Sequence, residues 1–152
     1  NGTIAPVIID AVGVGTYDAS RGRIEAENYF RREGGVEKVD TAPEGGRHDS
    51  FAVRVPEDGV LVYPMVRSAT ARLRFRLHRG PAASSSLTTA EVRVTFDGSR
   101  VGECDLGSPD ASGIVNCAPL TALSTSEDKE RGVDVSFRFR GGTVELDWFE
   151  FI

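Results

Sequence analysis

Two carboxylates separated by one residue, Glu25 and Glu27, are the first residues of this sequence whose types and spacing suggest chemistry. Apolar and charged residues alternate over residues 23–28, and this period of two predicts a half-buried strand with both carboxylates on one face. Calcium takes six to eight oxygen ligands, so this pair would suit calcium if a neighbouring strand supplied a third carboxylate. The alternative is that both glutamates are solvated and pair with arginines such as Arg23.

The two cysteines, Cys104 and Cys117, suggest a second kind of chemistry. Gly107, Pro109 and Gly113 lie between them, so the segment reads as a turn-rich connection between two strands. A disulfide closing this loop would stabilise the fold by about 3 kcal/mol and would imply an oxidising, secreted location. Two buried free thiols remain the alternative.

Arginines at alternate positions of several predicted strands form a third group. If those strands are neighbours, a basic stripe lies on one sheet face and could bind an acidic polysaccharide through bidentate contacts. Acidic residues alternate on the same faces, so a neutralised, salt-bridged surface is the other interpretation. The arginines concerned are Arg72, Arg74, Arg76, Arg93, Arg138 and Arg140.

Catalytic motifs do not occur in the sequence. There is no Gly-x-Ser-x-Gly elbow and no metal-binding spacing of His and Cys, and the only histidines are His48 and His78. Gly13-Val14-Gly15 lacks the third glycine and the following helix of a phosphate-binding loop. We therefore expect a domain that is not an enzyme; a small catalytic sandwich would require a buried carboxylate pair away from the calcium position.

The composition fits one domain rich in turns. The chain has 152 residues, 17 of them Gly and 7 Pro, with a net charge of −5. That charge argues against a nucleic-acid partner, and no apolar run approaches the roughly 20 residues that span a membrane. Residues 1–19 read as a tether or a terminal strand, and residues 20–152 as the domain itself.

The elements that must position these side chains are predicted to be short strands with alternating apolar residues. Residues 56–59 and Asp97-Gly98 provide turn signals between them. This pattern predicts an all-β fold, a sandwich of two sheets. The strands are expected at residues 51–55, 60–63, 73–77, 92–96, 101–106, 133–140 and 143–151.

Four motifs occur in an order that resembles carbohydrate-binding modules of family 6 and the related family 35. They are Arg23–Tyr29, Asp58–Tyr63, Val94–Gly98 and Leu146–Phe151. The resemblance extends from about residue 17 to residue 152. It implies a β-sandwich of jelly-roll type, appended to a secreted glycoside hydrolase, that binds sugars without cleaving them. It also implies a structural Ca²⁺ ion held by Glu25, Glu27 and Asp147.

The resemblance also points to a sugar cleft, where this sequence departs from the family pattern. Phe51 stands nearest the expected tyrosine, Ile114 replaces the expected tryptophan, and Glu145 replaces an asparagine. One aromatic wall is therefore missing. Plain alternatives are core packing for Phe51 and solvated loop polarity for the polar residues. The candidate carbohydrate-binding residues are Phe51, Ile114, Asn116, Glu145, His48 and Asp49.

These observations together predict a monomeric, calcium-stabilised, secreted module that targets a glycoside hydrolase in the same parent chain to a polysaccharide. An acidic polysaccharide is one candidate ligand, because the stacking walls are reduced and arginines are abundant. The alternative is a structural or interaction β-sandwich that has kept the fold and lost the cleft. No nucleic-acid or membrane partner is expected.

Overall fold

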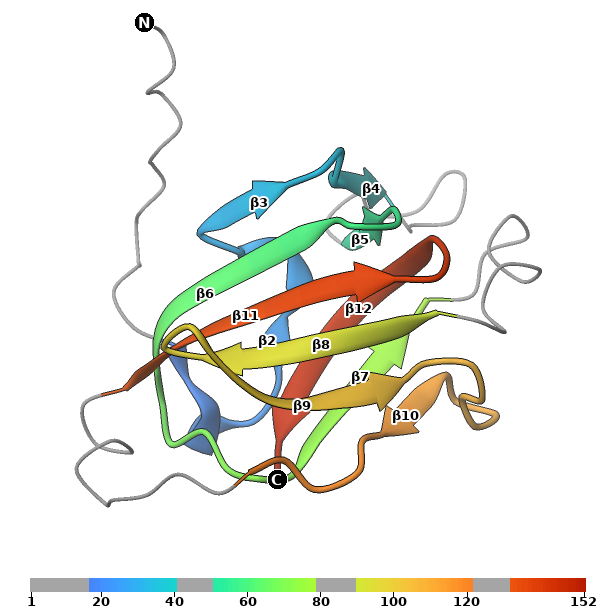
Figure 1. The fold of residues 1–152 in the computed structure, drawn as a ribbon. Coiled ribbons are helices and arrows are strands. Elements are labelled where there is room, and N and C mark those ends of the chain that lie inside the picture. Colours follow the sequence, from blue (N-terminus) through green and yellow to red (C-terminus); the bar gives the residue numbers. More distant parts are fainter. Residues whose placement is uncertain (1–16, 41–50, 79–89, 122–131) are drawn as a thin grey trace, which may run out of the picture.

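The strands of this protein form two facing sheets. The structure, a computed structural model, describes residues 17–40, 51–78, 90–121 and 132–152, which contain twelve strands and two short 3-10 turns. In Figure 1, β8 and β11 of one sheet lie in front of β12 of the other. The predicted all-β, two-sheet sandwich is thus confirmed. None of the described residues belongs to a helix long and apolar enough to cross a membrane.

One layer, named sheet I here, has the strand order β1-β6-β11-β8-β9, with β3 paired to β6 beside β1. Its pairs are antiparallel except for the short parallel pair of β1 with β6. The bounds of its strands are β1 Tyr17–Asp18, β3 Arg31–Glu33, β6 Val60–Arg67, β8 Glu91–Phe96, β9 Ser99–Asp105 and β11 Val133–Arg140.

The other layer, sheet II, has the order β10-β7-β12-β5-β4, with β2 paired to β12. All of its pairs are antiparallel. Its strands and the two 3-10 turns have the bounds β2 Ile24–Glu25, β4 Glu37–Asp40, β5 Phe51–Val55, β7 Leu73–Leu77, β10 Ile114–Asn116, β12 Val144–Phe151, η3 Ala19–Arg21 and η4 Ala26–Asn28.

The core lies between the sheets and is built mainly from alternate residues of β5, β6, β7, β8, β11 and β12, as the alternating pattern predicts. At its centre Phe149 packs edge-to-face against Phe137, with ring centroids 4.9 Å apart, and against Tyr63 at 4.7 Å. Phe75 joins the cluster 5.1 Å from Phe137. Edge-to-face pairs of buried rings stabilise beyond the area they bury, so this cluster holds the two sheets together.

Turn chemistry confirms the predicted connections. Asp97 and Gly98 have φ angles of 51° and 83°, the left-handed conformation that a two-residue hairpin between β8 and β9 requires. The turn before β6 is closed by a hydrogen bond from the Gly59 amide to the Pro56 carbonyl, 2.9 Å long. Both turns set the register of the strands that follow them.

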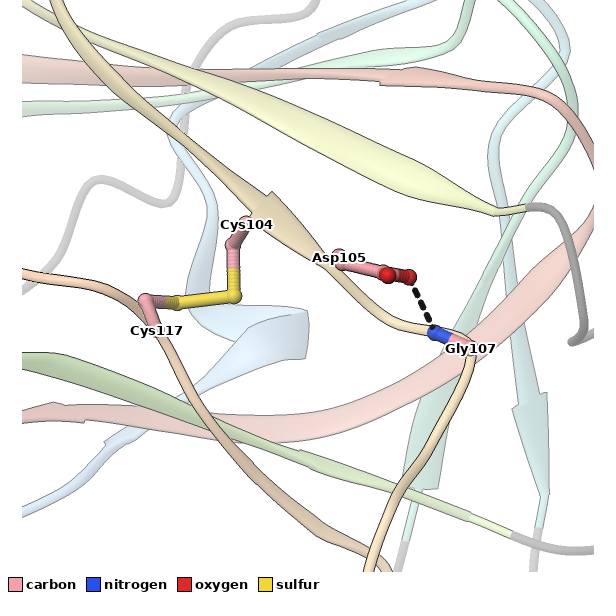
Figure 2. Close-up of a disulfide and its surroundings, with 4 residues drawn as sticks. All are labelled: Cys104, Asp105, Gly107 and Cys117. Carbon is pink, nitrogen blue, oxygen red and sulfur yellow. Dashed lines mark hydrogen bonds between the residues drawn. A yellow bond between two sulfur atoms is a disulfide. The ribbon is translucent and has the colours of Figure 1, made fainter.

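The two sheets are also joined covalently at one edge. Cys104 on β9 and Cys117, one residue past β10, form a disulfide (Figure 2). Since β9 is an edge strand of sheet I and β10 an edge strand of sheet II, the bond ties the two layers where neither continues. The Cys117 amide donates to the Leu73 carbonyl at 3.0 Å, and this fixes the far side of the link to β7. The disulfide is present in this structure, and the described residues contain no free thiol.

One segment differs from the expectation for it, and the expected N-terminal segment is described only at its end. Only Ile24 and Glu25 form a strand in the segment expected to be extended, because the chain then turns into η4. At the N-terminal end, Tyr17 and Asp18 pair with β6, and Ala19 belongs to the core. This end of the expected N-terminal segment is therefore part of the sandwich; residues 1–16 lie outside the described residues.

Candidate functional site

The outer face of sheet II is shaped by a bulge in β12. Leu146 pairs with Leu77 and Trp148 with Arg76, so Asp147 is an extra residue in β12. The bulge places Trp148 on the same face as Arg76, outside the core, although only 8% of its surface is exposed. The Arg23 guanidinium covers its ring at 5.6 Å from the centroid. Alternation along β12 predicts an inward Trp148, and the bulge reverses that expectation.

Every β7 arginine on this face has a carboxylate partner on β12. Arg76 pairs with Asp147, and Arg74 Nη2 lies 2.7 Å from Glu150 Oε1. Both contacts run between neighbouring strands, so the register of β7 on β12 creates them. For these two arginines the neutralised surface is the correct interpretation.

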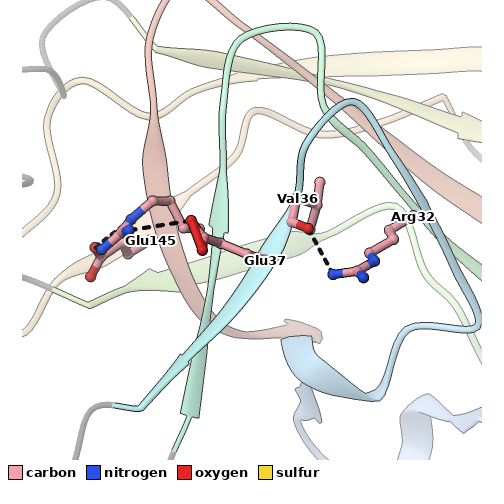
Figure 3. Close-up of polar contacts among 5 residues, drawn as sticks. Arg32, Val36, Glu37 and Glu145 are labelled. Atoms are coloured by element: carbon pink, nitrogen blue, oxygen red, sulfur yellow. Dashed lines mark hydrogen bonds and ion pairs between the residues drawn. The ribbon is translucent and has the colours of Figure 1, made fainter.

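A further ion-pair group crosses β4, β5 and β12. Arg54 Nη2 lies 2.9 Å from Glu145 Oε2, and Arg54 Nη1 lies 3.4 Å from Glu37 Oε2. Figure 3 shows Glu37 and Glu145 converging on the same guanidinium, with Arg32 apart from them on the Val36 carbonyl. The hydrogen bond to Glu145 and the charges of both carboxylates raise the pKa of Arg54.

Glu145 is the only buried charged residue in the part of the chain that the structure describes. Arg54 stands opposite Glu145 in the pairing of β5 with β12 and donates a hydrogen bond to its carboxylate. A buried pair of carboxylates free to act as acid and base is therefore absent from the described ranges. Glu145 is also a predicted sugar-contact position, and in this structure its carboxylate links β12 to Arg54 on β5.

The three carboxylates predicted to hold calcium lie around the β2–η4 turn. Burial raises the pKa of Glu27, and the charges of Glu25 and Asp147 raise it further. Glu27 Oε1 is buried without a hydrogen-bond partner. Such an orphaned oxygen among like charges suits a hard cation chemically. However, Arg23 Nε holds Glu25 at 2.8 Å.

Asp147, the third of these carboxylates, is likewise held by an arginine, Arg76. In the described segments no three His, Cys, Asp or Glu side chains converge as a metal site. Carboxylate oxygens are the ligand type that calcium prefers, but in this arrangement the three side chains do not converge and arginines hold two of them.

Two tyrosines that the sequence-based reasoning did not single out hold the turn that carries Glu27. The Tyr63 hydroxyl donates to the Ala26 carbonyl at 2.7 Å, and the Tyr17 hydroxyl donates to the Asn28 carbonyl at 2.6 Å. Burial raises the pKa of both phenols, so both remain protonated donors. No local signal identifies these contacts, because the partners lie 37 and 11 residues away.

The predicted sugar-cleft residues are not brought together. Ile114 and Asn116 pair with Arg76 and Arg74 and so share the outer face of sheet II. Phe51 lies on the face of Val53, turned toward the other sheet, and Lys38 Nζ is 4.8 Å from its ring centroid. Three strand spacings, about 14 Å, separate β5 from β10.

Phe51 and Ile114 therefore do not form two walls of one cleft. His48 and Asp49, the remaining predicted cleft residues, lie outside the described residues.

The outer face of sheet I has a different pattern of charge. Arg138 on β11 stands directly opposite Arg93 on β8, and Arg140 stands opposite Glu91. In the next row Thr95 and Ser136 face one another, and their hydroxyls are hydrogen-bonded. Of the arginines predicted to form one stripe, only those on β8 and β11 are neighbours, because β7 belongs to the other sheet.

Comparison with known proteins identifies the fold. A family 6 carbohydrate-binding module is 14% identical with a TM-score of 0.65 over 90% of this chain and 95% of that one. A family 6 module from Clostridium stercorarium, solved in complex with cellobiose, is 18% identical to this chain with a TM-score of 0.65. The match covers 91% of this chain and 97% of that one. A family 6 module from Clostridium cellulolyticum, solved in complex with xylose, is 20% identical with a TM-score of 0.61. The match covers 86% of this chain and 95% of that one.

The same fold occurs within a larger protein. The catalytic unit of an α-1,3-glucanase from Streptomyces thermodiastaticus matches 85% of this chain and only 25% of its own length, with 16% identity and a TM-score of 0.53. No family model and no curated protein matches the sequence. The chain has the fold of family 6 carbohydrate-binding modules.

Proposed function

We propose that this protein is a non-catalytic carbohydrate-binding module that targets a glycoside hydrolase in the same parent chain to a polysaccharide outside the cell. The observation that carries this proposal is the shared fold with family 6 modules over most of the chain. The glucanase catalytic unit supports the link to a hydrolase, since it contains a region of the same fold. The Cys104–Cys117 disulfide supports an oxidising location.

An acidic polysaccharide is the ligand class we favour. Neutral sugars are held mainly by stacked aromatic rings, and here Phe51 and Ile114 do not converge while Trp148 is buried beneath Arg23. Polar and charged side chains dominate both outer faces instead. Arginine binds carboxylate and sulfate groups through paired hydrogen bonds, which gives an acidic chain an advantage over a neutral one.

Affinity electrophoresis of the purified chain through gels with embedded polysaccharides tests the function. We expect slower migration in at least one gel from a panel of neutral glucans, xylan and uronic-acid polymers, relative to a gel without polysaccharide. Unchanged migration in every gel would contradict the proposed function. A serum albumin control corrects for sieving by the polymer.

We further propose that calcium stabilises the fold through Glu25, Glu27 and Asp147. The orphaned Oε1 of Glu27 and the raised pKa of its carboxyl support a cation there. Binding by all three residues requires Arg23 and Arg76 to release their carboxylates. We expect millimolar calcium to raise the melting temperature relative to EGTA and magnesium to do so less. Identical melting in calcium and EGTA would refute the metal site.

A structural or interaction role is the second candidate, and the separation of Phe51 from Ile114 favours it. Three large apolar side chains among the described residues, Phe30, Met65 and Ile152, are also more than half exposed. Under this alternative the chain retains no polysaccharide affinity and instead binds its catalytic domain. Co-purification of the separately expressed domains, together with unretarded migration in every gel, would identify this role.

A further inference from the structure

We propose that the outer face of sheet I binds the acidic groups of a polysaccharide between Arg93 on β8 and Arg138 on β11. This inference rests on the proposed carbohydrate-binding function and assigns it a place and a chemistry. The shared chemistry is an oxyanion on a sugar ring, either the carboxylate of a uronic acid or a sulfate ester.

The register of the two strands places the guanidinium groups side by side. Arg138 pairs with Arg93, Phe137 with Val94 and Phe139 with Val92. The phenylalanines and valines are buried in the core, so the two arginines point to the opposite, outer face. Directly opposed residues have β-carbons about 5 Å apart, and like charges at that distance destabilise the pair. An anion between them removes the repulsion.

The carboxylates of this face do not lie opposite Arg138: Glu91 stands opposite Arg140 and Asp105, in the next row. Glu103 on β9 is shared by two arginines, lying 2.5 Å from Arg100 Nη2 and 3.6 Å from Arg93 Nε. Arg93 Nε is buried and has no hydrogen-bond acceptor. Within the described ranges no carboxylate lies within ion-pair distance of Arg138. A positive charge on β11 is thus left for an external partner.

The neighbouring row suits the remainder of a sugar. Thr95 and Ser136 lie on the same face one step along the strands, and their hydroxyls both donate and accept hydrogen bonds. Arg100, opposite Thr95, extends the row onto β9. The hydroxyl row therefore lies directly beside the Arg93–Arg138 row, where it could contact the hydroxyl groups of the same sugar.

The binding should depend strongly on salt and on charge. The whole chain carries a net charge of −5, so attraction of a polyanion must come from this local group rather than from the overall field. The participating arginine side chains are partly exposed, 32% for Arg93 and 55% for Arg100, so mobile ions screen them.

Isothermal titration with three defined polymers tests the site: polygalacturonate, dextran sulfate and uncharged dextran. We expect at least one charged polymer to bind and dextran to bind at least tenfold more weakly. Arg138→Ala should weaken binding of the charged polymer at least about tenfold, because charge-assisted hydrogen bonds are lost. Arg138→Lys, which keeps the charge but not the paired geometry, should retain part of the affinity. The two charged polymers distinguish a carboxylate ligand from a sulfate ligand.

Arg72→Ala is the matched control. Arg72 is exposed and immediately precedes β7 of the other sheet, so the substitution removes the same charge elsewhere and should leave affinity unchanged. Melting curves of each variant verify folding. If Arg138→Ala and Arg72→Ala bind charged polymers equally well, this site is wrong while the carbohydrate-binding function stands. If only neutral polysaccharides bind, the acidic-group assignment is wrong, and if none binds, the proposed function fails with it.

Discussion

The outer faces of the two sheets use the same residue types and reach opposite electrostatic results. On sheet II, Arg54, Arg74 and Arg76 each meet a carboxylate on β12. On sheet I, Arg138 meets Arg93, and one glutamate on β9 is shared by two arginines. An arginine paired with a carboxylate stabilises the fold, whereas an arginine that faces another arginine keeps its charge available for a ligand. The difference shows that cross-strand register decides what an arginine does.

Loss of the disulfide should have the largest effect on the free energy of unfolding, and it leaves the outer faces of both sheets unaltered. Replacing both Cys104 and Cys117 by Ser opens a link spanning 13 residues and should lower the free energy of unfolding by about 3 kcal/mol. Urea denaturation of the oxidised protein and the variant measures this. Reduced wild-type protein should match the variant; a wild-type midpoint unaffected by reduction would show that the link does not stabilise the sandwich.

On the balanced face, Glu145→Gln should lower the free energy of unfolding by about 1 to 2 kcal/mol. The substitution removes a buried charge that accepts two hydrogen bonds from Arg54. Glu37→Gln replaces the half-exposed carboxylate that also pairs with Arg54. It should lower the free energy of unfolding by less than about 0.5 kcal/mol. Equal losses for the two variants would mean that burial does not distinguish these contacts.

The same charge reversal should have opposite signs on the two faces. Arg138→Glu replaces a like-charge pair with an ion pair across from Arg93 and should raise the free energy of unfolding by about 0.5 kcal/mol. Arg74→Glu places a carboxylate beside Glu150 and should lower it by about 1 kcal/mol. Thermal denaturation at low and high salt measures both. A destabilised Arg138→Glu protein would remove the contrast between the faces.

A smaller effect, dependent on pH, is expected from Glu27 in η4. Burial raises the pKa of Glu27 above its unfolded value, so the folded state holds the proton more tightly. Stability therefore falls as pH rises from the unfolded pKa, about 4.3, through the higher folded pKa. Glu27→Gln should raise the melting temperature at pH 7 in EGTA and leave it unchanged near pH 3. The substitution should also reduce any increase in melting temperature caused by calcium. If the difference in melting temperature between variant and wild type did not change with pH, titration of Glu27 would be excluded as its cause.

Much of the fold could be predicted from local pattern. The strands β5, β7 and β8 begin and end within one residue of their predicted bounds, because each alternates apolar and polar residues between recognisable turns. The exception near Glu25 has a physical reason: η4 is held by hydroxyls of Tyr63 and Tyr17, which lie elsewhere in the chain. Periodicity within a short segment contains no information about such partners.

The candidate site could be predicted only in part. The charges of Glu25 and Asp147 raise the pKa of Glu27, so these three carboxylates lie in one region. The pairing of Glu25 with Arg23 is an alternative that the sequence offers, whereas the contact of Asp147 with Arg76 was not predicted. Trp148 is buried, as alternation predicts, but a one-residue bulge places it on the outer face of sheet II and not between the sheets. Phe51 and Ile114 are both present, yet they belong to strands that are not neighbours.

The amino-acid sequence by itself determined the all-β class, the position of the seven longest strands and their inward set of apolar residues, since alternation and turn chemistry act over a few residues. Only the tertiary structure decided which arginine meets a carboxylate, which meets another arginine, and which face Trp148 occupies. These choices depend on strand order and on a register shift of one residue, and both are set by packing between segments far apart in the chain.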